Sequence, residues 1–119
     1  MSFPTLPTYK HNYYLFHMWD IPTAQRAKHL GDHVKVTAPL IQSGAIILGG
    51  ALLPPTMKTS DPEPLKKPAG SFFFVRADSL EQAWEIIKQD PFYTSGEVWD
   101  RESITGAPAY MVMPEVKFE

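Results

Sequence analysis

The sequence contains no cysteine among its 119 residues, and this absence removes several kinds of site at once. Disulfide bonds, thiolate nucleophiles, thiolate zinc sites and iron–sulfur ligation are excluded, because each needs a cysteine sulfur. Long apolar runs are also missing: the longest, residues 45–53, includes two glycines and falls well short of the about 20 residues that cross a bilayer. Residues 1–10 lack the apolar stretch of a secretory signal. We therefore expect a soluble, cytoplasmic protein.

Basic residues are not in excess either. Lys and Arg number 11 against 13 Asp and Glu, which gives a formal net charge of −2. No Lys/Arg run is present to neutralise nucleic-acid phosphates or anionic lipids. Neither the G-x-G-x-x-G fingerprint nor a P-loop occurs. We predict no nucleic-acid partner, no membrane partner and no cofactor.

Apolar residues and prolines are abundant. Hydrophobic residues make up 44% of the chain and charged residues 20%, which is typical of a globular protein. The length suits one domain with one modest core. Residues 1–11 carry Pro4 and Pro7 without periodicity, so we interpret them as an extended arm in front of a domain over 12–119. Five of the 12 prolines lie in residues 54–70 and predict a loop that is functional or mobile.

Hydrophobic periodicity predicts alternating strands and helices. A first helix covers residues 24–43, and a second begins at Asp78 or Ser79 and ends at Asp90. Strands are predicted over 12–19, 45–53, 71–76, 97–104 and 109–113. The order β-α-β-β-α-β predicts a ferredoxin-like α+β sandwich, with an antiparallel sheet and both helices on one face. The other face carries large apolar residues and must be covered, most simply by an identical sheet in a homodimer with two-fold symmetry.

The first helix separates its apolar residues from its histidines. One apolar stripe follows from helical spacing and consists of Ala27, Leu30, Val34, Ala38 and Ile41. His29 and His33 lie about 40° apart, beside Arg26, on a flank roughly 70–130° from the centre of that stripe. This flank is either the border of a pocket or a solvated surface, and spacing alone leaves both open. Pro39 predicts a kink or an early end of the regular helix, and Gly44 predicts its stop.

Three short motifs resemble one family. Residues 26–30 (RAKHL) resemble the R-x-x-H-L signature in the first helix of YciI-like proteins, the YCII-related domain family. Residues 43–45 with 48–50 resemble that family's glycine-containing second strand, and residues 90–92 followed by Gly96 resemble its turn after the second helix. The motifs occur in the family's order over about residues 13–104. The resemblance implies a dimeric α+β barrel with a pocket between sheet and helices and a His–Asp pair, here His29 and Asp90. The family is similar in fold to muconolactone isomerases and to small cofactor-free monooxygenases, and some of its members are lyase-like dehalogenases.

Carried over to this chain, the His–Asp pair predicts acid–base chemistry. His29 would transfer the proton and Asp90 would orient the imidazole, although Asp before Pro also commonly closes a helix. Trp99 and Arg101 share one face of the predicted strand 97–104, where they would offer a stacking wall and a cation. The expected substrate-binding residues are Arg26, His17, His33, Trp99, Arg101 and Phe92.

No metal site is expected. His29 and His33 have the i, i+4 spacing of helical metal ligands, but Leu30 stands where the H-E-x-x-H motif has Glu. Relative to the family, the long Pro-rich loop, the N-terminal arm and the extension over 109–119 are additions. The loop and the arm would cover the pocket and narrow the range of substrates, and the alternative for the loop is an inert surface segment.

The favoured function is a small cofactor-independent enzyme. It would perform histidine-based isomerisation, elimination or dehydration, a lyase-like chemistry, on a small cyclic or aromatic metabolite. The alternative is a non-catalytic dimer that binds a small molecule or serves as an accessory protein, because fold alone does not decide function. A cofactor-free oxygenase is a third hypothesis.

Overall fold

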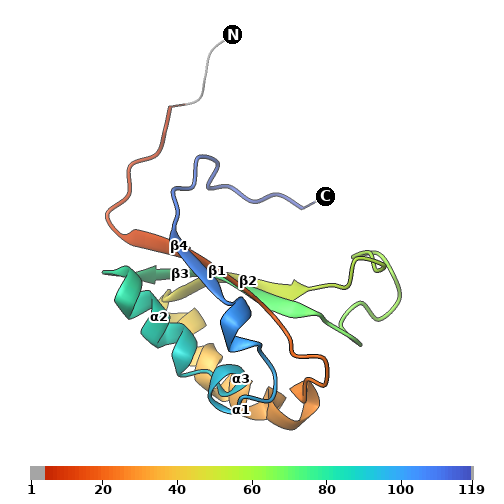
Figure 1. Ribbon diagram of the computed structural model, residues 1–119. Coiled ribbons are helices and arrows are strands. Elements are labelled where there is room, and N and C mark those ends of the chain that lie inside the picture. The colour runs from red at the N-terminus through yellow and green to blue at the C-terminus, as the bar shows by residue number, and fades with distance from the viewer. Residues whose placement is uncertain (1–4, 119) are drawn as a thin grey trace.

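The computed structural model describes residues 5–118, in which three helices lie on one side of a four-stranded sheet (Figure 1). In chain order the elements are β1 (Asn12–Trp19), α1 (Arg26–Ser43), β2 (Ile46–Leu52), β3 (Gly70–Ala77), α2 (Leu80–Lys88), α3 (Pro91–Thr94), the short 3-10 helix η1 (Arg101–Ser103) and β4 (Thr105–Pro108). Among these residues, no helix is long and apolar enough to cross a membrane.

The sheet has the strand order β2-β3-β1-β4, and all its pairings are antiparallel. β1 and β3 pair over their full length at the centre, from Asn12 opposite Ala77 to Trp19 opposite Gly70. β2 and β4 form the two edges. This order, with helices between β1 and β2 and between β3 and β4, is that of the ferredoxin-like sandwich, so the predicted fold is confirmed.

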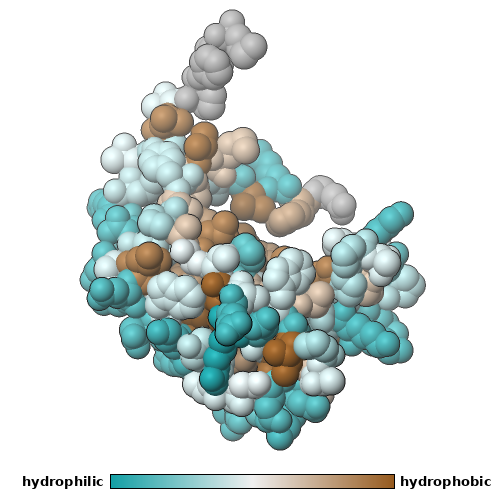
Figure 2. Space-filling model, in the orientation of Figure 1, coloured by the Kyte–Doolittle hydropathy of each residue, from teal (hydrophilic) through white to brown (hydrophobic). Residues whose placement is uncertain are grey.

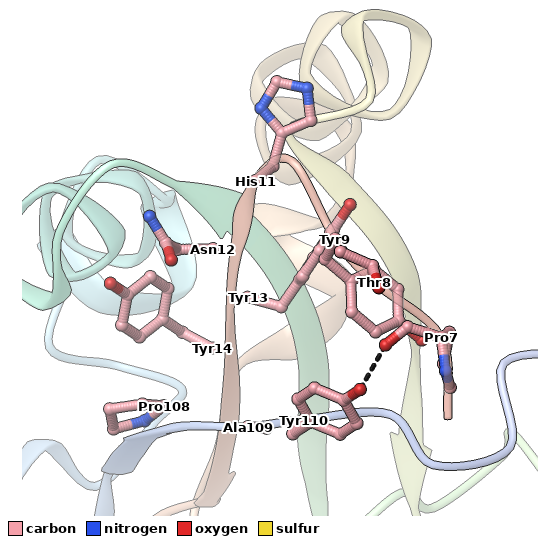
Figure 3. Close-up of a pocket in the computed structure, with 10 residues that line it drawn as sticks. All are labelled: Pro7, Thr8, Tyr9, His11, Asn12, Tyr13, Tyr14, Pro108, Ala109 and Tyr110. Atoms are coloured by element: carbon pink, nitrogen blue, oxygen red, sulfur yellow. Dashed lines mark hydrogen bonds between the residues drawn. The ribbon is translucent and has the colours of Figure 1, made fainter. Parts of the chain in front are cut away.

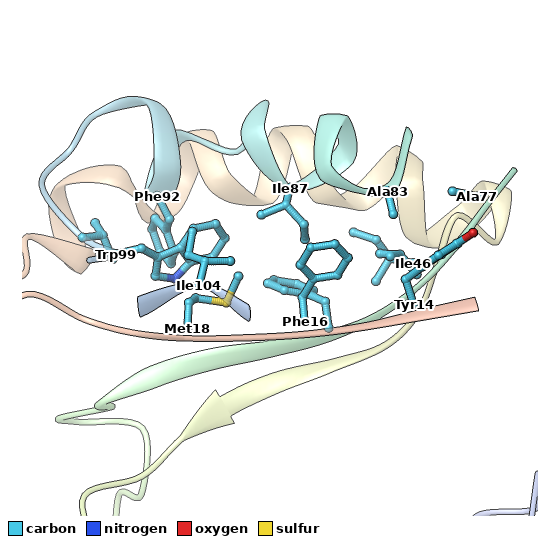
Figure 4. Close-up of a cluster of buried hydrophobic side chains, with 13 residues drawn as sticks. Tyr14, Phe16, Met18, Ile46, Ala77, Ala83, Ile87, Phe92, Trp99 and Ile104 are labelled. Atoms are coloured by element: carbon cyan, nitrogen blue, oxygen red, sulfur yellow. The ribbon is translucent and has the colours of Figure 1, made fainter. Parts of the chain in front are cut away.

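The core lies between the sheet and the helices (Figure 4). Successive side chains of a strand point to opposite faces, and Tyr14, Phe16 and Met18 of β1 are buried while their neighbours are not. β3 contributes Phe73 and Val75 in the same way. The remaining core side chains come from β2, the end of β3, the two shorter helices and the segment before β4: Ile46, Ala77, Ala83, Ile87, Phe92, Val98, Trp99 and Ile104.

Several predicted helix ends are confirmed. Gly44 closes α1 in the left-handed conformation, with φ of 84°, which costs glycine nothing because it has no Cβ. Ser79, rather than Asp78, caps α2 by accepting a hydrogen bond from the Gln82 backbone N–H at 3.1 Å. Pro39 does not end α1, which continues to Ser43.

The apolar stripe of α1 is not the buried face, and this corrects the sequence reading. Leu30 and Val34 keep 53% and 50% of their surface exposed. The inward side is instead the flank with His29 and His33, and Thr37 is its buried residue. The physical reason is that this flank forms hydrogen bonds with polar residues at the start of α3 and in the loop before β4. The prediction from apolar spacing assumed that α1 packs on the core through apolar contacts alone.

The segment after α2 also differs from the prediction. The expected strand over 97–104 is reduced to one bridge, Trp99 with Asp20, followed by η1. η1 forms because Asp100 caps it, accepting a hydrogen bond from the Glu102 backbone N–H at 3.0 Å. The edge strand is therefore β4, whereas residues 109–113 form no strand. The turn after the second helix, which the resemblance places at residues 90–92 followed by Gly96, contains the short helix α3.

The two terminal segments contact each other on the side of the sheet away from the helices (Figure 1), and Figure 2 shows hydrophobic residues at the surface in the same region. Residues 5–11 of the expected arm form no helix or strand, and residues 1–4 fall outside the described part. The Tyr9 hydroxyl donates a hydrogen bond to the Met111 carbonyl at 2.8 Å, and the Tyr110 hydroxyl donates one to the Pro7 carbonyl. Beyond this contact, the C-terminal segment borders a small apolar hollow against Leu48 of β2 and Phe74 of β3.

Candidate active site

A pocket of about 290 Å³ lies between α1 and the β2–β3 side of the sheet. Its walls are mostly apolar and come from β2 and from Phe73 of β3. Four polar side chains line it: Arg26, His33, Thr37 and Ser71. An apolar pocket with a few convergent polar groups is the usual form of a small-molecule site.

His33 is held by a buried carboxylate. Its Nδ1 lies 2.8 Å from Asp90 Oδ1 and 2.7 Å from Oδ2, and the Asp90 residue is only 3% exposed. An ionised carboxylate can only accept, so Nδ1 carries the hydrogen, and in the neutral imidazole Nε2 then has the lone pair. Because His33 lines the pocket, this arrangement can supply a base to a bound molecule.

Local sequence explains why Asp90 stands at this point. Asp90 is the N-cap of α3, accepting a hydrogen bond from the Phe92 backbone N–H at 2.8 Å, and Pro91 follows at the first helical position. Asp and Pro are both favoured at these positions. The helix-closing role of Asp90 and its contact with histidine are therefore compatible. The Phe92 ring is stacked on His33, with centroids 4.0 Å apart and planes at 6°, and this stacking fixes the imidazole from a second side.

The expected contact between His29 and Asp90 is wrong. His29 Nε2 lies 2.9 Å from Glu97 Oε1 instead, and His29 does not line the pocket. Lys28 donates to the same carboxylate, with Nζ 3.1 Å from Oε1. These two contacts lower the pKa of Glu97 below its usual value of 4.5, with the hydrogen bond from His29 the larger cause. His33, one turn further along α1, is the histidine that reaches Asp90.

Arg26 is already paired. Its Nε and Nη2 donate to the two carboxylate oxygens of Asp20 at 2.5 and 2.9 Å, and Nη2 also donates to the Gly70 carbonyl and to Ser71 Oγ. The guanidinium lies over the Phe92 ring, 5.2 Å from its centroid. Arg26 therefore lines the pocket as expected, but with its charge largely balanced by Asp20.

Three other expected binding residues lie away from the pocket surface. Trp99 is buried in the core and donates from Nε1 to Ser71 Oγ at 3.1 Å. His17 lies in β1 between two inward-facing residues, so its side chain is on the opposite, exposed face of the sheet. Arg101 belongs to η1, where it donates to the Tyr93 and Thr94 carbonyls. The predicted shared strand face of Trp99 and Arg101 does not exist, because the chain turns into η1 between them.

The glycine pair of β2 forms part of the pocket wall. A Cβ built on Gly49 would lie 3.1 Å from the Phe73 ring, and one on Gly50 would lie 2.7 Å from the Phe72 ring. A side chain at Gly49 would crowd the buried Phe73 ring and take up space beside the pocket, whereas one at Gly50 would meet the Phe72 ring on the opposite face of the sheet. Because both glycines lack a Cβ, a ligand can approach the backbone closely at this part of the pocket wall.

A second hollow, of about 400 Å³, lies between the terminal segments and the start of β1 (Figure 3). Tyrosine rings dominate it, and Tyr9 packs edge-on against Tyr13 and Tyr110 with centroids 5.4 Å apart in both cases. Desolvation, followed by the nearby Tyr110 and Tyr13, raises the pKa of Tyr9. No carboxylate lines this hollow, so it offers no counterpart to the His33–Asp90 pair.

Sequence reasoning did not identify Thr37, Ser71, Asp20 or Glu97 as part of the site. Thr37 and Ser71 are ordinary residues of a helix and a strand, and no local motif marks them. Within residues 5–118, no group of three or more His, Asp or Glu side chains is placed to hold a metal ion. His29 and His33 instead contact two different carboxylates.

Comparison with known proteins identifies a family and solved structures with a similar fold. The family model of the YCII-related domain matches residues 12–105. The 5-chloro-2-hydroxyhydroquinone dehydrochlorinase TftG from Burkholderia phenoliruptrix AC1100, solved in complex with 2,5-dihydroxybenzoquinone, is 24% identical with a TM-score of 0.65, over 80% of this chain and 90% of that chain. PA3566 from Pseudomonas aeruginosa is 8% identical with a TM-score of 0.44, over 86% and 95%. No curated protein matches the chain.

Proposed function

The chain belongs to the YCII-related domain family, and from this premise we propose that it is a cofactor-independent enzyme that removes a proton from a small cyclic or aromatic substrate. The reaction class is elimination, dehydration or isomerisation. The observation that carries the proposal is the His33 imidazole, which is fixed by the buried Asp90 carboxylate and faces a pocket of ring-sized volume. The similar fold of a dehydrochlorinase supports the class of reaction without identifying the substrate.

The proposed mechanism begins at His33 Nε2. This nitrogen accepts a proton from the substrate, and the Asp90 carboxylate stabilises the imidazolium that forms. In an elimination, the leaving group must sit on a tetrahedral ring carbon, which a hydroxylated aromatic ring provides as its keto tautomer once a hydroxyl proton has moved to that carbon. The electron pair of the C–H or O–H bond that His33 breaks then forms the new double bond. The leaving group, a halide or hydroxide, departs with the electrons of its own bond. His33 then passes the proton to water or to the departing hydroxide, which returns the site to its starting state.

The first test is a substrate screen with a histidine control. Chlorinated and hydroxylated hydroquinones would be incubated with the protein without added cofactor, and chloride release and product absorbance would be followed. We expect His33→Gln to lower kcat/KM at least about 100-fold, the usual contribution of a general base. His17→Gln, on the other sheet face, is the matched control and should keep the activity. Full activity in His33→Gln would contradict the mechanism.

The pH profile separates this proposal from the non-catalytic alternative. A protonated imidazole cannot accept a proton, so the rate should fall on acidification. A protein that only holds an apolar ligand would bind it with little change over the same range. If no compound in the screen is converted but several bind with little pH dependence, the binding or accessory role replaces the enzyme.

We also propose that the protein is a cytoplasmic homodimer joined through the exposed face of the sheet. Leu15 and Trp19 of β1 are large apolar side chains that remain exposed on this face, and an identical sheet would cover them. Light scattering after size-exclusion chromatography should give twice the mass of 13.4 kDa. Leu15→Glu should shift the population to the monomer, and a monomeric unmodified protein would contradict the proposal.

A further inference from the structure

We infer that Ser71 is an oxyanion donor: its hydroxyl binds the substrate oxygen on which negative charge develops when His33 removes the proton. This inference rests on the proposed function and narrows the substrate to rings that carry a phenolic, enolic or quinone oxygen. Ser71 lies in β3, is 4% exposed and lines the same pocket as His33. Nothing in the comparisons assigns it a role.

The argument starts from the two donors that already contact Ser71. Arg26 Nη2 lies 3.0 Å from Ser71 Oγ, and Trp99 Nε1 lies 3.1 Å from it. A guanidinium and an indole nitrogen can only donate. Ser71 Oγ must therefore accept both hydrogen bonds, which uses both of its lone pairs.

The hydroxyl hydrogen of Ser71 is not used in these two hydrogen bonds. A serine hydroxyl has one donor and two acceptor positions, and among residues 5–118 the two hydrogen bonds of Ser71 Oγ are both ones that it accepts. Since buried polar groups rarely stay unpaired, the hydroxyl hydrogen is available to an acceptor inside the pocket. The neighbouring Thr37 differs, because its hydroxyl donates to the His33 carbonyl at 2.9 Å.

The surroundings of Ser71 strengthen it as a donor. The hydrogen bonds form a chain from the Arg26 guanidinium to Ser71 Oγ, and each bond in such a chain polarises the next. Asp20 holds Arg26 in place and balances part of its charge. Trp99 is fixed in the core by edge-on contacts with Phe73 and Phe92. A donor oriented in advance in a partly dry site favours charge that appears only in the transition state.

The ligand class follows from the donor and the base together. Removing a proton from a hydroxylated ring leaves negative charge that resonance carries to a ring oxygen. The pocket offers His33 as the proton acceptor and Ser71 as the donor to that oxygen, while its remaining wall is apolar. A ring without an oxygen would leave the Ser71 hydroxyl unpaired and would bind less tightly.

The test measures the ionisation of a bound phenol by absorbance, using 4-nitrophenol as the probe. The charged groups nearest the pocket are Arg26 with its partner Asp20, and His33 with its partner Asp90. We expect the bound phenol to ionise at lower pH than in free solution, with an ionisation constant raised about tenfold, which is one pKa unit. Ser71→Ala should remove most of this shift, and Thr105→Val, which removes an exposed hydroxyl of β4 outside the pocket, should retain it.

A second variant distinguishes loss of the Ser71 donor from a general loss of structure. Ser71→Ala leaves the donors of Arg26 and Trp99 without their shared acceptor, so its near-ultraviolet circular dichroism must match that of the unmodified protein. Ser71→Cys keeps the size but donates weakly, and it should give an intermediate shift. An unshifted probe in the unmodified protein, an equal shift in Ser71→Ala, or no saturable binding of either 4-nitrophenol or 2,5-dihydroxybenzoquinone would overturn the inference.

The two proposals fail in different ways. A Ser71-dependent shift without any His33-dependent turnover would keep the oxyanion site and remove the catalytic function. Turnover that depends on His33 but is unaltered in kcat by Ser71→Ala, together with an unshifted phenol, would keep the function and remove the role of Ser71.

Discussion

Two histidines one turn apart on α1 each contact a carboxylate, and the two pairs differ in how deeply that carboxylate is buried. His29 and His33 have nearly equal side-chain exposure, 15% and 16%. Their partners do not: the side chain of Asp90 is 5% exposed and that of Glu97 is 41% exposed. The carboxylate, rather than the histidine, therefore separates the two pairs.

The difference reflects how each carboxylate is held. Asp90 is fixed by its own helix cap and by stacking of Phe92 on the imidazole, so His33 is oriented without help from solvent. Glu97 is shared between His29 and Lys28 at the protein surface. A preorganised pair suits catalysis, whereas a solvated pair is better suited to joining α1 to the loop after α3.

The largest expected effect is the difference in kcat/KM between substitutions of the two histidines. His29→Gln should change kcat/KM by no more than about threefold, whereas His33→Gln should lower it at least about 100-fold. The measurement is the same turnover assay on both variants, with their melting temperatures compared. Equal losses from both variants would show that the two pairs act together, and the distinction between them would then be wrong.

That His33 rather than His29 contacts Asp90 is a feature that the sequence could not predict. The flank of α1 that carries both histidines follows from helical spacing, and the flank does face the pocket side of the fold. Which histidine meets Asp90 depends on how α3 is placed against α1, and that placement is a tertiary contact. His29 and His33 are only four residues apart in sequence, but this spacing decides which of the two histidines contacts Asp90.

The fold was more predictable than the site for a physical reason. Strand alternation and helix caps are local, so β1, β3, Ser79 and Gly44 were accessible from short windows of sequence. The apolar stripe of α1 led to a wrong prediction of the buried face, since Leu30 and Val34 have helical spacing yet remain exposed. Ser71 carries no local signal at all, because its role depends on Arg26 and Trp99, which arrive from distant segments.

The next effect compares the two carboxylates. Asp90→Asn should lower kcat on the order of 100-fold, because an amide does not stabilise the imidazolium as a carboxylate does. Asn is as good an N-cap as Asp, so α3 and the melting temperature should be preserved. Glu97→Gln should leave kcat unchanged. A preserved kcat in Asp90→Asn would show that the charge of this carboxylate is not used.

A smaller effect compares two glycines, one in the pocket and one outside it. Gly49→Val should raise KM about tenfold, because the added side chain takes up pocket space beside Phe73. A single methyl group changes the free energy of binding in an apolar pocket by about 1 kcal/mol. Gly31 is on the exposed side of α1, where an added Cβ meets nothing within 4 Å. Gly31→Ala should leave KM unchanged and stabilise the protein by about 0.5–1 kcal/mol. Chemical denaturation and Michaelis curves on both variants would measure the two outcomes, and an unchanged KM in Gly49→Val would contradict the assigned pocket.

The smallest effect is the pH dependence of the His29–Glu97 pair. The hydrogen bonds from His29 and Lys28 lower the pKa of Glu97 in the folded protein, so the unfolded chain binds a proton more readily at this position. The resulting stabilisation is present above the ordinary pKa of 4.5 and is lost as the pH falls through the lowered folded value. Melting temperatures of the unmodified protein and Glu97→Gln should therefore differ slightly at neutral pH and converge on acidification. A difference that grows toward low pH would mean that Glu97 is not held as its contacts indicate, and that the pair does not join α1 to its loop.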